Sequence, residues 1–277
     1  MYTLNCKGKL LVADKPLVMG ILNITPDSFY EGHIEKSIAD MVTMAEKMTI
    51  DGADIIDIGG QSTKPGSNRI TAAEELSRIL PVIKAIKDKK PEIILSVDTY
   101  YSEVAVAAVK AGAGIVNDIS AGNMDSKMFE TVAALQVPYI AMHMKGTPET
   151  MQHDPHYDDV VKEVLDFFIL KTAACTKAGI HDVIIDPGFR FGKTIRHNFQ
   201  LLKNLAVFKI LNRPVLAGLS RKGTVYKTLN TTPAEALNGT TCVNSIALMN
   251  GAGMLRVHDV KEAREVVTLL TAYNAVS

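Results

Sequence analysis

The sequence lacks an excess of charge of either sign, since its 277 residues include 30 Lys and Arg and 30 Asp and Glu. A neutral chain gives no electrostatic argument for nucleic acid or an anionic membrane as a partner, so a local group of side chains must hold any bound anion. Cysteine is scarce as well. Cys6, Cys175 and Cys242 are scattered and show neither disulfide nor metal-ligand spacing, which predicts a reduced, cytoplasmic protein.

Long apolar segments are also missing. No apolar run is long enough to cross a bilayer, and the first residues lack the apolar core of a signal peptide, so we expect no membrane association. The chain contains no linker rich in Pro, Gly or Ser, no low-complexity tract and no internal repeat that would divide it. These absences predict one domain spanning residues 1–277.

Short apolar runs rich in Val and Ile alternate with longer amphipathic segments. Apolar runs without a period of two are typical of parallel strands that are buried on both faces. Eight such units predict an α/β protein with a single (β/α)8 TIM barrel. A doubly wound open sheet is the alternative, but it usually has fewer strands, and no G-x-G-x-x-G follows the first run. The predicted strands are residues 17–23, 54–60, 92–98, 114–118, 138–143, 182–188, 214–220 and 253–258.

Several helix boundaries are marked by local sequence. Capping-box patterns predict that helices begin at Thr71 and at Thr232, the second with Pro at its first helical position. Gly52, Gly112 and Gly179 are predicted to end helices ahead of the next strand.

Polar side chains stand at the end of every predicted strand. In a barrel of this kind the active site is built at the carboxyl ends of the strands. One Asp or Asn after a strand often caps a helix or a turn, but a polar group at all eight ends predicts a pocket for a polar, planar ligand. The residues are Asn23, Asp57, Asp98, Asn117, Asp118, His143, Asp186, Ser220, Arg221, Lys222, Arg256 and His258.

The chemistry of these residues favours a guanine-like or pterin-like ring that carries a phosphate. Asp98 and Asp186 can accept paired hydrogen bonds from an N–H beside an NH₂, and Asn117 can donate and accept at once. Cationic side chains in the same set can hold a phosphate or a ring oxygen. No pair of nucleophile and base stands out, because Ser220 lacks a surrounding G-x-S-x-G.

Seven ordered motifs resemble those of the dihydropteroate synthase family, the folate-pathway enzymes that sulfonamides inhibit. The motifs are MGILNITPDSF, GADIIDIGGQSTKPG, SVDT, VNDISAG, DPGFRFGKT, LSRKG and RVHDV, and they run from about Leu17 to the last helix. The resemblance implies condensation of 6-hydroxymethyl-7,8-dihydropterin diphosphate with p-aminobenzoate, which releases pyrophosphate and 7,8-dihydropteroate. It also implies a (β/α)8 barrel, Mg²⁺ and a homodimer.

The resemblance also implies roles for individual residues, which are carried over from the motifs that they occupy. Catalysis would involve Lys222, Arg256 and the acidic Glu31, and Asn23 would ligate Mg²⁺. The pterin ring would contact Asp98, Asn117, Met142, Asp186 and Lys222. The diphosphate would contact Asn23, Lys64, Arg256 and His258. The p-aminobenzoate pocket would comprise Phe29, Thr63, Pro65, Phe191 and Lys222.

A polar segment, NITPDSFYEGH, separates the first strand from its helix and resembles the first loop of the family. A long loop in this position is commonly a lid over the active site. The chain departs from the family pattern at several places in the loops. Tyr30-Glu31-Gly32 stands where S-D-G is common, Gln61 and Lys64 replace Glu and Arg, and Arg190 stands where Gly is frequent.

Two other functions are compatible with part of this pattern. A methyltetrahydrofolate-binding methyltransferase domain would share the barrel and the pterin-binding carboxylates, but it would not need the STKPG and SRKG segments found here. A non-catalytic pterin- or folate-binding barrel would not need the anion-holding residues. Release of pyrophosphate from the two substrates separates all three hypotheses.

Overall fold

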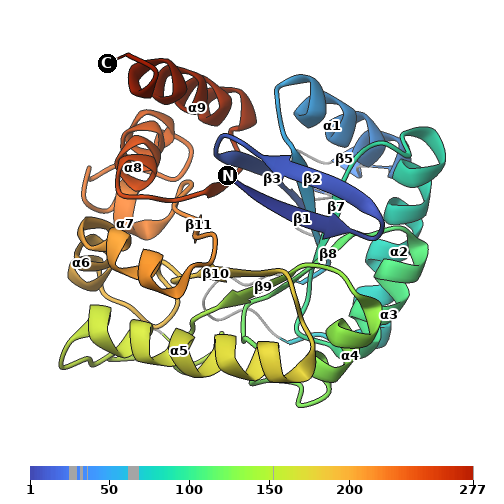
Figure 1. Cartoon of the computed structure of the whole chain (residues 1–277). Helices are drawn as coiled ribbons and strands as arrows, with labels where there is room; N and C mark the ends of the chain where they lie inside the picture. Colours follow the sequence, from blue (N-terminus) through green and yellow to red (C-terminus); the bar gives the residue numbers. More distant parts are fainter. Residues whose placement is uncertain (25–29, 32–33, 36, 62–68, 152, 277) are drawn as a thin grey trace.

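Eight parallel strands form a nearly closed barrel at the centre of the computed structural model, which describes residues 1–24, 30–31, 34–35, 37–61, 69–151 and 153–276 (Figure 1). The strands are hydrogen-bonded in the order β10-β9-β8-β7-β6-β3-β12-β11. A parallel bridge between Ile185 and Val215 joins the two ends of this sheet, which confirms the predicted TIM barrel. The strands are β3 (Leu17–Asn23), β6 (Ile55–Gly59), β7 (Leu95–Asp98), β8 (Ile115–Asp118), β9 (Tyr139–Met142), β10 (Val183–Asp186), β11 (Leu216–Ala217) and β12 (Met254–Val257).

Helices surround the barrel and bury its outer face (Figure 1). All eight strands lie in predicted strand segments, and almost every strand residue is buried, as expected for a parallel sheet covered by helices. The helices are α1 (Ile38–Ile50), α2 (Ala72–Lys89), α3 (Ser102–Ala111), α4 (Met128–Leu135), α5 (Val160–Ala178), α6 (Ile195–Lys203), α7 (Gly223–Tyr226), α8 (Leu237–Met249) and α9 (Val260–Asn274), with a 3-10 helix at Leu205–Leu211. No helix in the described ranges is long and apolar enough to span a bilayer.

An antiparallel hairpin of β1 (Tyr2–Cys6) and β2 (Lys9–Ala13) closes the amino-terminal end of the barrel, and the sequence did not predict it. Lys7 and Gly8 form its turn, both with positive φ, which matches the right-handed twist of the strands. Leu4 and Cys6 pack on apolar side chains that fill the barrel below the polar ring. Two short strands of mixed polarity carry too weak a pattern to predict.

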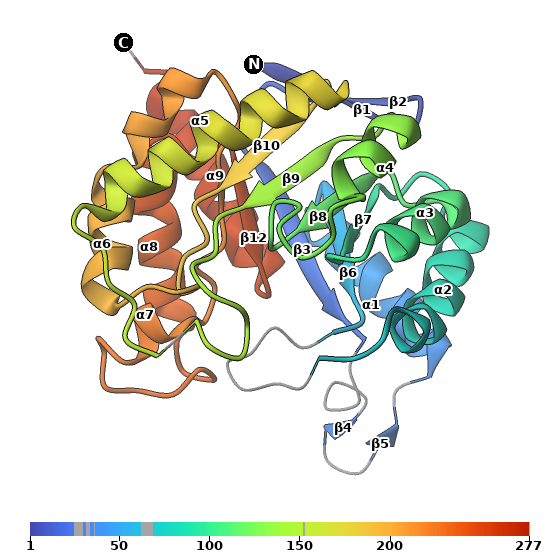
Figure 2. The same ribbon diagram turned by 90° about the horizontal axis from the view of Figure 1, so that it is seen from below.

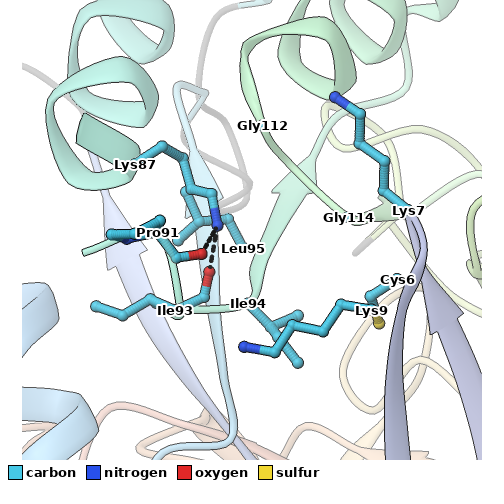
Figure 3. A pocket seen from close by; sticks show the side chains of 10 residues that line it. All are labelled: Cys6, Lys7, Lys9, Lys87, Pro91, Ile93, Ile94, Leu95, Gly112 and Gly114. Carbon is cyan, nitrogen blue, oxygen red and sulfur yellow. Dashed lines mark hydrogen bonds between the residues drawn. The ribbon is translucent and has the colours of Figure 1, made fainter. Parts of the chain in front are cut away.

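A cavity of about 250 Å³ lies between this hairpin and the start of β7 (Figure 3). Its lysines bind backbone carbonyls near the ends of helices. Lys87 Nζ donates to the carbonyls of Pro91 and Ile93 at 2.7 and 2.8 Å, and Lys7 Nζ donates to that of Val109 at 2.6 Å. These contacts place favourable positive charge at helix carboxyl ends. The cavity is at the opposite end of the barrel from the polar ring.

The predicted helix boundaries hold except at one place. Thr71 caps α2, and Gly112 and Gly179 end α3 and α5 with positive φ. Gly52 follows the cap of α1. The predicted helix start at Thr232 is wrong, because α8 begins only at Leu237.

A guanidinium explains the late start of α8. Arg221 Nη1 binds the carbonyl oxygens of Pro233 and Ala234, which a helix starting there would have needed for its own first turn. Thr232 Oγ1 donates to the Glu235 carboxylate at 3.1 Å and accepts the N–H of Glu235 at 3.4 Å, so the contacts of the capping-box pattern stabilise a turn here.

The connection between β3 and α1 is long, as the sequence predicted. Its described part contains β4 (Tyr30–Glu31) and β5 (Ile34–Glu35), which pair antiparallel. Figure 2 shows this pair projecting beyond the carboxyl end of β3. The connection therefore starts at the mouth of the barrel, where the polar ring lies.

Candidate active site

Arg256 lies at the centre of the polar ring, between two carboxylates. Its Nε donates to Oδ2 of Asp57 at 2.6 Å, and its Nη2 donates to Oδ2 of Asp98 at 2.6 Å. Asn117 Nδ2 donates to the same Asp57 oxygen at 2.9 Å. Strands β12, β6, β7 and β8 thus supply one connected group. Burial, with repulsion from nearby carboxylates, raises the pKa of Asp98 to about 7, while Arg256 opposes this shift.

Asp57 is a central member of the site, although the sequence predicted only its place in the polar ring and assigned it no substrate contact. It lies within β6, is fully buried, and its Oδ1 has no hydrogen-bond partner among the described residues. A buried carboxylate is costly unless it is paired, so its contact with Arg256 is essential to the arrangement. The signal in the sequence was a single Asp inside the otherwise apolar segment IIDIG.

Asp186, at the end of β10, and Lys222, at the amino-terminal cap of α7, form the second half of the ring. Asp186 Oδ1 accepts the N–H of Gly188 at 2.8 Å, and Lys222 Nζ donates to the carbonyl of Phe189 at 2.9 Å. Burial lowers the pKa of Lys222 to about 8, while the charge of Asp186 opposes this shift. Lys222 Nζ also lies 4.9 Å from the centroid of the Phe191 ring. The Lys222 ammonium therefore lies near Asp186, a predicted pterin residue, and Phe191, a predicted p-aminobenzoate residue.

His258 is held by Ser220, which the sequence placed in the polar ring without assigning it a partner. Ser220 Oγ accepts the backbone N–H of His258 at 3.2 Å and lies 3.0 Å from Nδ1 of the same residue. Its hydroxyl proton is then available to Nδ1, which assigns the ring proton to Nε2. Burial, together with the charge of Arg256, lowers the pKa of His258. The residue thus presents a neutral N–H donor at neutral pH.

Met142 and Phe191 belong to one buried apolar cluster with Tyr100, Ile119 and Met151, which forms a wall beside the polar ring. Asn23 ends β3 and is exposed at the barrel mouth. No group of three or more His, Cys, Asp or Glu within the described part of the chain could hold a metal. A metal bound at Asn23 would therefore take most of its ligands from substrate and water, as Mg²⁺ commonly does.

Three of the predicted strand-end residues have side chains that bind other protein groups and do not face the pocket. Asp118 accepts hydrogen bonds from Tyr139, Ser120 and Gly122 at 2.7 Å, so its carboxylate is occupied. His143 is buried behind the ring, with Nδ1 2.8 Å from Lys193 Nζ.

Arg221, the third of these residues, forms a bidentate pair with Asp259 at 2.9 and 2.8 Å. The same side chain holds the turn before α8. Its guanidinium is therefore committed to protein partners.

Some predicted residues lie outside the described part of the structure. These are Phe29, Thr63, Lys64 and Pro65, together with the side chain of Glu31, whose backbone lies in β4. Two of the departures from the family pattern are described. Gln61 is buried and its Oε1 accepts the hydroxyl of Tyr100 at 2.8 Å. Arg190 has a φ of 78°, which explains why Gly is frequent at this position.

Comparison with known proteins matches residues 19–258 to the family described as pterin binding enzyme. Dihydropteroate synthase of Escherichia coli K12 is 44% identical over 268 residues, which cover 96% of this chain and 94% of that protein. The structure of Xanthomonas albilineans dihydropteroate synthase with 4-aminobenzoic acid has a TM-score of 0.93 and 41% identity, with 99% of both chains covered. The structure of the Xanthomonas albilineans enzyme in complex with 7,8-dihydropteroate has a TM-score of 0.90 and 39% identity, with both chains fully covered.

Proposed function

The chain belongs to the dihydropteroate synthase family of pterin binding enzymes. We propose that different residues of its polar ring bind the pterin, stabilise the leaving pyrophosphate and hold the arylamine in that family's reaction. The reaction condenses 6-hydroxymethyl-7,8-dihydropterin diphosphate with p-aminobenzoate and yields 7,8-dihydropteroate and pyrophosphate. The observation that carries the assignment is the Arg256 guanidinium, which is held between Asp57 and Asp98 and lies close enough to Lys222 and Asp186 to influence their pKa values.

The strand-end side chains bind the pterin ring. Asp98 and Asp186 accept hydrogen bonds from ring nitrogens, and Asn117 supplies the amide between them. Lys222 donates to the ring oxygen, and Met142, which is buried, packs against the flat face. All of these groups except Lys222, which caps α7, come from strands, so they are positioned before the substrate arrives.

The anion-holding residues stabilise the leaving pyrophosphate. Two nitrogens of Arg256 are bound by carboxylates, which leaves Nη1 without a protein acceptor among the described residues. The neutral His258 adds an N–H donor. As the bond between the pterin methylene carbon and the diphosphate oxygen breaks, negative charge develops on that oxygen, and fixed donors stabilise it without reorganisation. The electron-rich dihydropterin spreads the positive charge left on the methylene group.

The arylamine of p-aminobenzoate then forms a bond to the methylene carbon and loses one proton. A neutral arylamine is already nucleophilic, so no strong general base is required, which agrees with the lack of a nucleophile–base pair in the described site. We place the arylamine against Phe191 and Lys222. Phe29, Thr63 and Pro65 complete this pocket in the proposal, with Lys64 on the diphosphate and Glu31 near the developing cation, on the strength of their sequence motifs alone.

Magnesium is part of the proposal as the partner of the diphosphate. The Asn23 side chain fits it, because a neutral amide oxygen at an exposed edge is a hard ligand that leaves room for phosphate oxygens and water. When bound, Mg²⁺ would neutralise charge on the leaving pyrophosphate. Removal of divalent cations with EDTA should then lower turnover, and added Mg²⁺ should restore it.

A cytoplasmic homodimer is the proposed state of the protein. The three cysteines are free, two of them buried, which suits a reducing compartment. Helices α8 and α9 pack together, and they expose large apolar side chains such as Met249, Leu269 and Tyr273, which a second copy would cover. Sedimentation at micromolar concentration tests the dimer, and a monomer there would contradict it.

Mixing both substrates with Mg²⁺ and measuring pyrophosphate and dihydropteroate tests the function. Equal amounts of both products are expected. Pterin binding without product would instead indicate a binding protein, and methyl transfer from methyltetrahydrofolate would indicate the methyltransferase alternative.

Arg256→Gln and Arg264→Gln provide a matched pair of variants for this assay. Arg256→Gln should lose most of the activity because it removes the charge that holds pyrophosphate. Arg264 binds Asp54 and the carbonyl of Gly52 away from the ring, so Arg264→Gln should retain the activity of the folded protein.

A further inference from the structure

A buried ammonium supports the loop between β10 and α6. The side chain of Lys193 is only 2% exposed. Its Nζ donates to the carbonyls of Gly188 and Phe191, both at 2.9 Å, and to Nδ1 of His143 at 2.8 Å. Lysine is almost never fully buried unless it is paired. The carbonyl of His143 lies within reach as well, at 3.4 Å, so all three N–H groups of the ammonium have acceptors. Burial lowers the pKa of Lys193 well below the ordinary lysine value, while the charge of Asp186 and these acceptors favour the protonated form.

The loop that Lys193 holds carries two contacts to Lys222. The carbonyl of Phe189 accepts from Lys222 Nζ at 2.9 Å, and the Phe191 ring lies 4.9 Å from the same atom. The two lysines therefore bind successive parts of one short loop. Lys193 anchors it from the protein interior, and Lys222 contacts it from the polar ring.

The third acceptor fixes the loop to the barrel wall. His143 directly follows β9, and burial lowers its pKa well below the ordinary range, with the charge of Lys193 adding to the shift. The imidazole therefore stays neutral and keeps a lone pair on Nδ1 for the ammonium. Its ring packs edge-on against Phe167 of α5, with centroids 4.8 Å apart. His143 thus offers an immobile point of attachment.

We propose that Lys193 is a positioning residue for the p-aminobenzoate half of the site, because it sets the place of Phe191 and, through the Phe189 carbonyl, of Lys222. The inference rests on the proposed function. Lys193 contacts neither substrate in this scheme. If its ammonium is removed, the Phe191 carbonyl loses its donor while buried, and the Gly188 carbonyl keeps only the N–H of Phe191 at 3.1 Å. The loop must then move to bring the Phe191 carbonyl to water or another partner.

Lys193→Met and Lys193→Gln, compared with Lys203→Met, test the proposal. Met keeps the length of the side chain and removes every donor, whereas Gln keeps an N–H donor. Lys203 is an exposed residue at the end of α6 and serves as the control. The KM for p-aminobenzoate should rise by about tenfold in Lys193→Met and by less in Lys193→Gln. The affinity for the pterin should fall by a smaller factor than the KM for p-aminobenzoate rises, because the carboxylates on the strands keep their places and only the hydrogen bond from Lys222 is displaced.

Activity of the parent protein separates the two possible failures. A parent that forms no dihydropteroate disproves the proposed function. An active parent whose Lys193 variants lose only melting temperature and kcat, with KM for p-aminobenzoate unchanged, overturns the positioning role. If Lys193→Met does not fold, Lys193→Gln decides by the same criterion. If neither folds, the residue serves the stability of the barrel and the proposal is wrong.

Discussion

Arg256 Nε lies 2.6 Å from Oδ2 of Asp57, although the two residues are 199 positions apart in the chain. They occupy β12 and β6, the two neighbours of β3 in the barrel. The carboxylate accepts from one edge of the guanidinium and thereby fixes the direction of the remaining edge. The cation therefore has a fixed direction before any substrate binds, which suits the proposed role of Arg256 as a preorganised donor to the diphosphate.

Asp57→Asn should destabilise the protein and weaken binding of the pterin diphosphate. The amide keeps the shape but leaves the buried Arg256 with Asp98 as its one close anionic partner. Loss of one partner of a buried pair costs about 3–5 kcal/mol. Urea unfolding measures the effect. The control is Asp166→Asn, which removes an exposed pair with Lys162 on α5 and should leave the free energy of unfolding almost unchanged. Equal stability of the two variants would contradict the central role of Asp57.

Asp186→Asn should weaken pterin binding by roughly a hundredfold, since a lost hydrogen bond to a charged group costs about 2–3 kcal/mol. The amide also turns one acceptor toward the ring into a donor. Calorimetry with a pterin ligand measures this. Asp182 lies just before β10, at the other end of that strand, where it accepts the N–H of Asn5 at 2.8 Å, so Asp182→Asn should leave affinity within twofold. If the pterin affinity of Asp186→Asn changed less than threefold, Asp186 would not be a pterin-binding residue.

Alkaline pH should reduce turnover through Lys222, whose pKa burial lowers to about 8. Above that pH the folded protein loses the ammonium donor, and kcat/KM for the pterin diphosphate should fall about tenfold by pH 9. The free energy of unfolding should increase over the same pH range in which kcat/KM falls. Since the unfolded chain keeps this proton up to the ordinary lysine pKa, the contribution of Lys222 to the free energy of unfolding should rise as pH increases above 8.

Lys222→Met provides the reference for both measurements. This variant should bind pterin weakly, and its binding should not fall further between pH 8 and pH 9. The same alkaline decline in Lys222→Met would show that another group controls it.

Gly188→Ala should cost several kcal/mol of stability and abolish activity. Gly188 has a φ of 68°, and an added Cβ would lie 1.9 Å from the carbonyl oxygen of His143. Gly179→Ala is the matched control, because its φ is 90° but nothing lies within 4 Å of an added Cβ. The control should lose about 1–2 kcal/mol, the penalty for an L-residue in the left-handed region. Thermal unfolding of both variants measures the difference, and equal losses would show that backbone strain, and not the close approach to His143, decides the effect.

The sequence by itself determined the barrel and the composition of its polar ring. Continuous apolar runs can be satisfied only by burial on both faces, so eight of them with intervening helical patterns lead to a closed parallel sheet. The residue after each run must then lie at the same end of the barrel. This reasoning located Asp98, Asn117, Asp186, Lys222 and Arg256 correctly, because strand direction alone decides which end a side chain occupies.

Only the tertiary structure decided which of these polar groups are available to a ligand. Asp98 and Asp118 end neighbouring strands with similar local sequence. The carboxylate of Asp118 accepts hydrogen bonds from Tyr139, Ser120 and Gly122, whereas that of Asp98 binds Arg256. No local pattern predicted that Lys193 would be buried, yet acceptors in its own loop and on the distant His143 make it a buried anchor. Strand period and direction are local properties of the chain, whereas the choice of hydrogen-bond partner depends on which distant segments the closed barrel brings within about 3 Å.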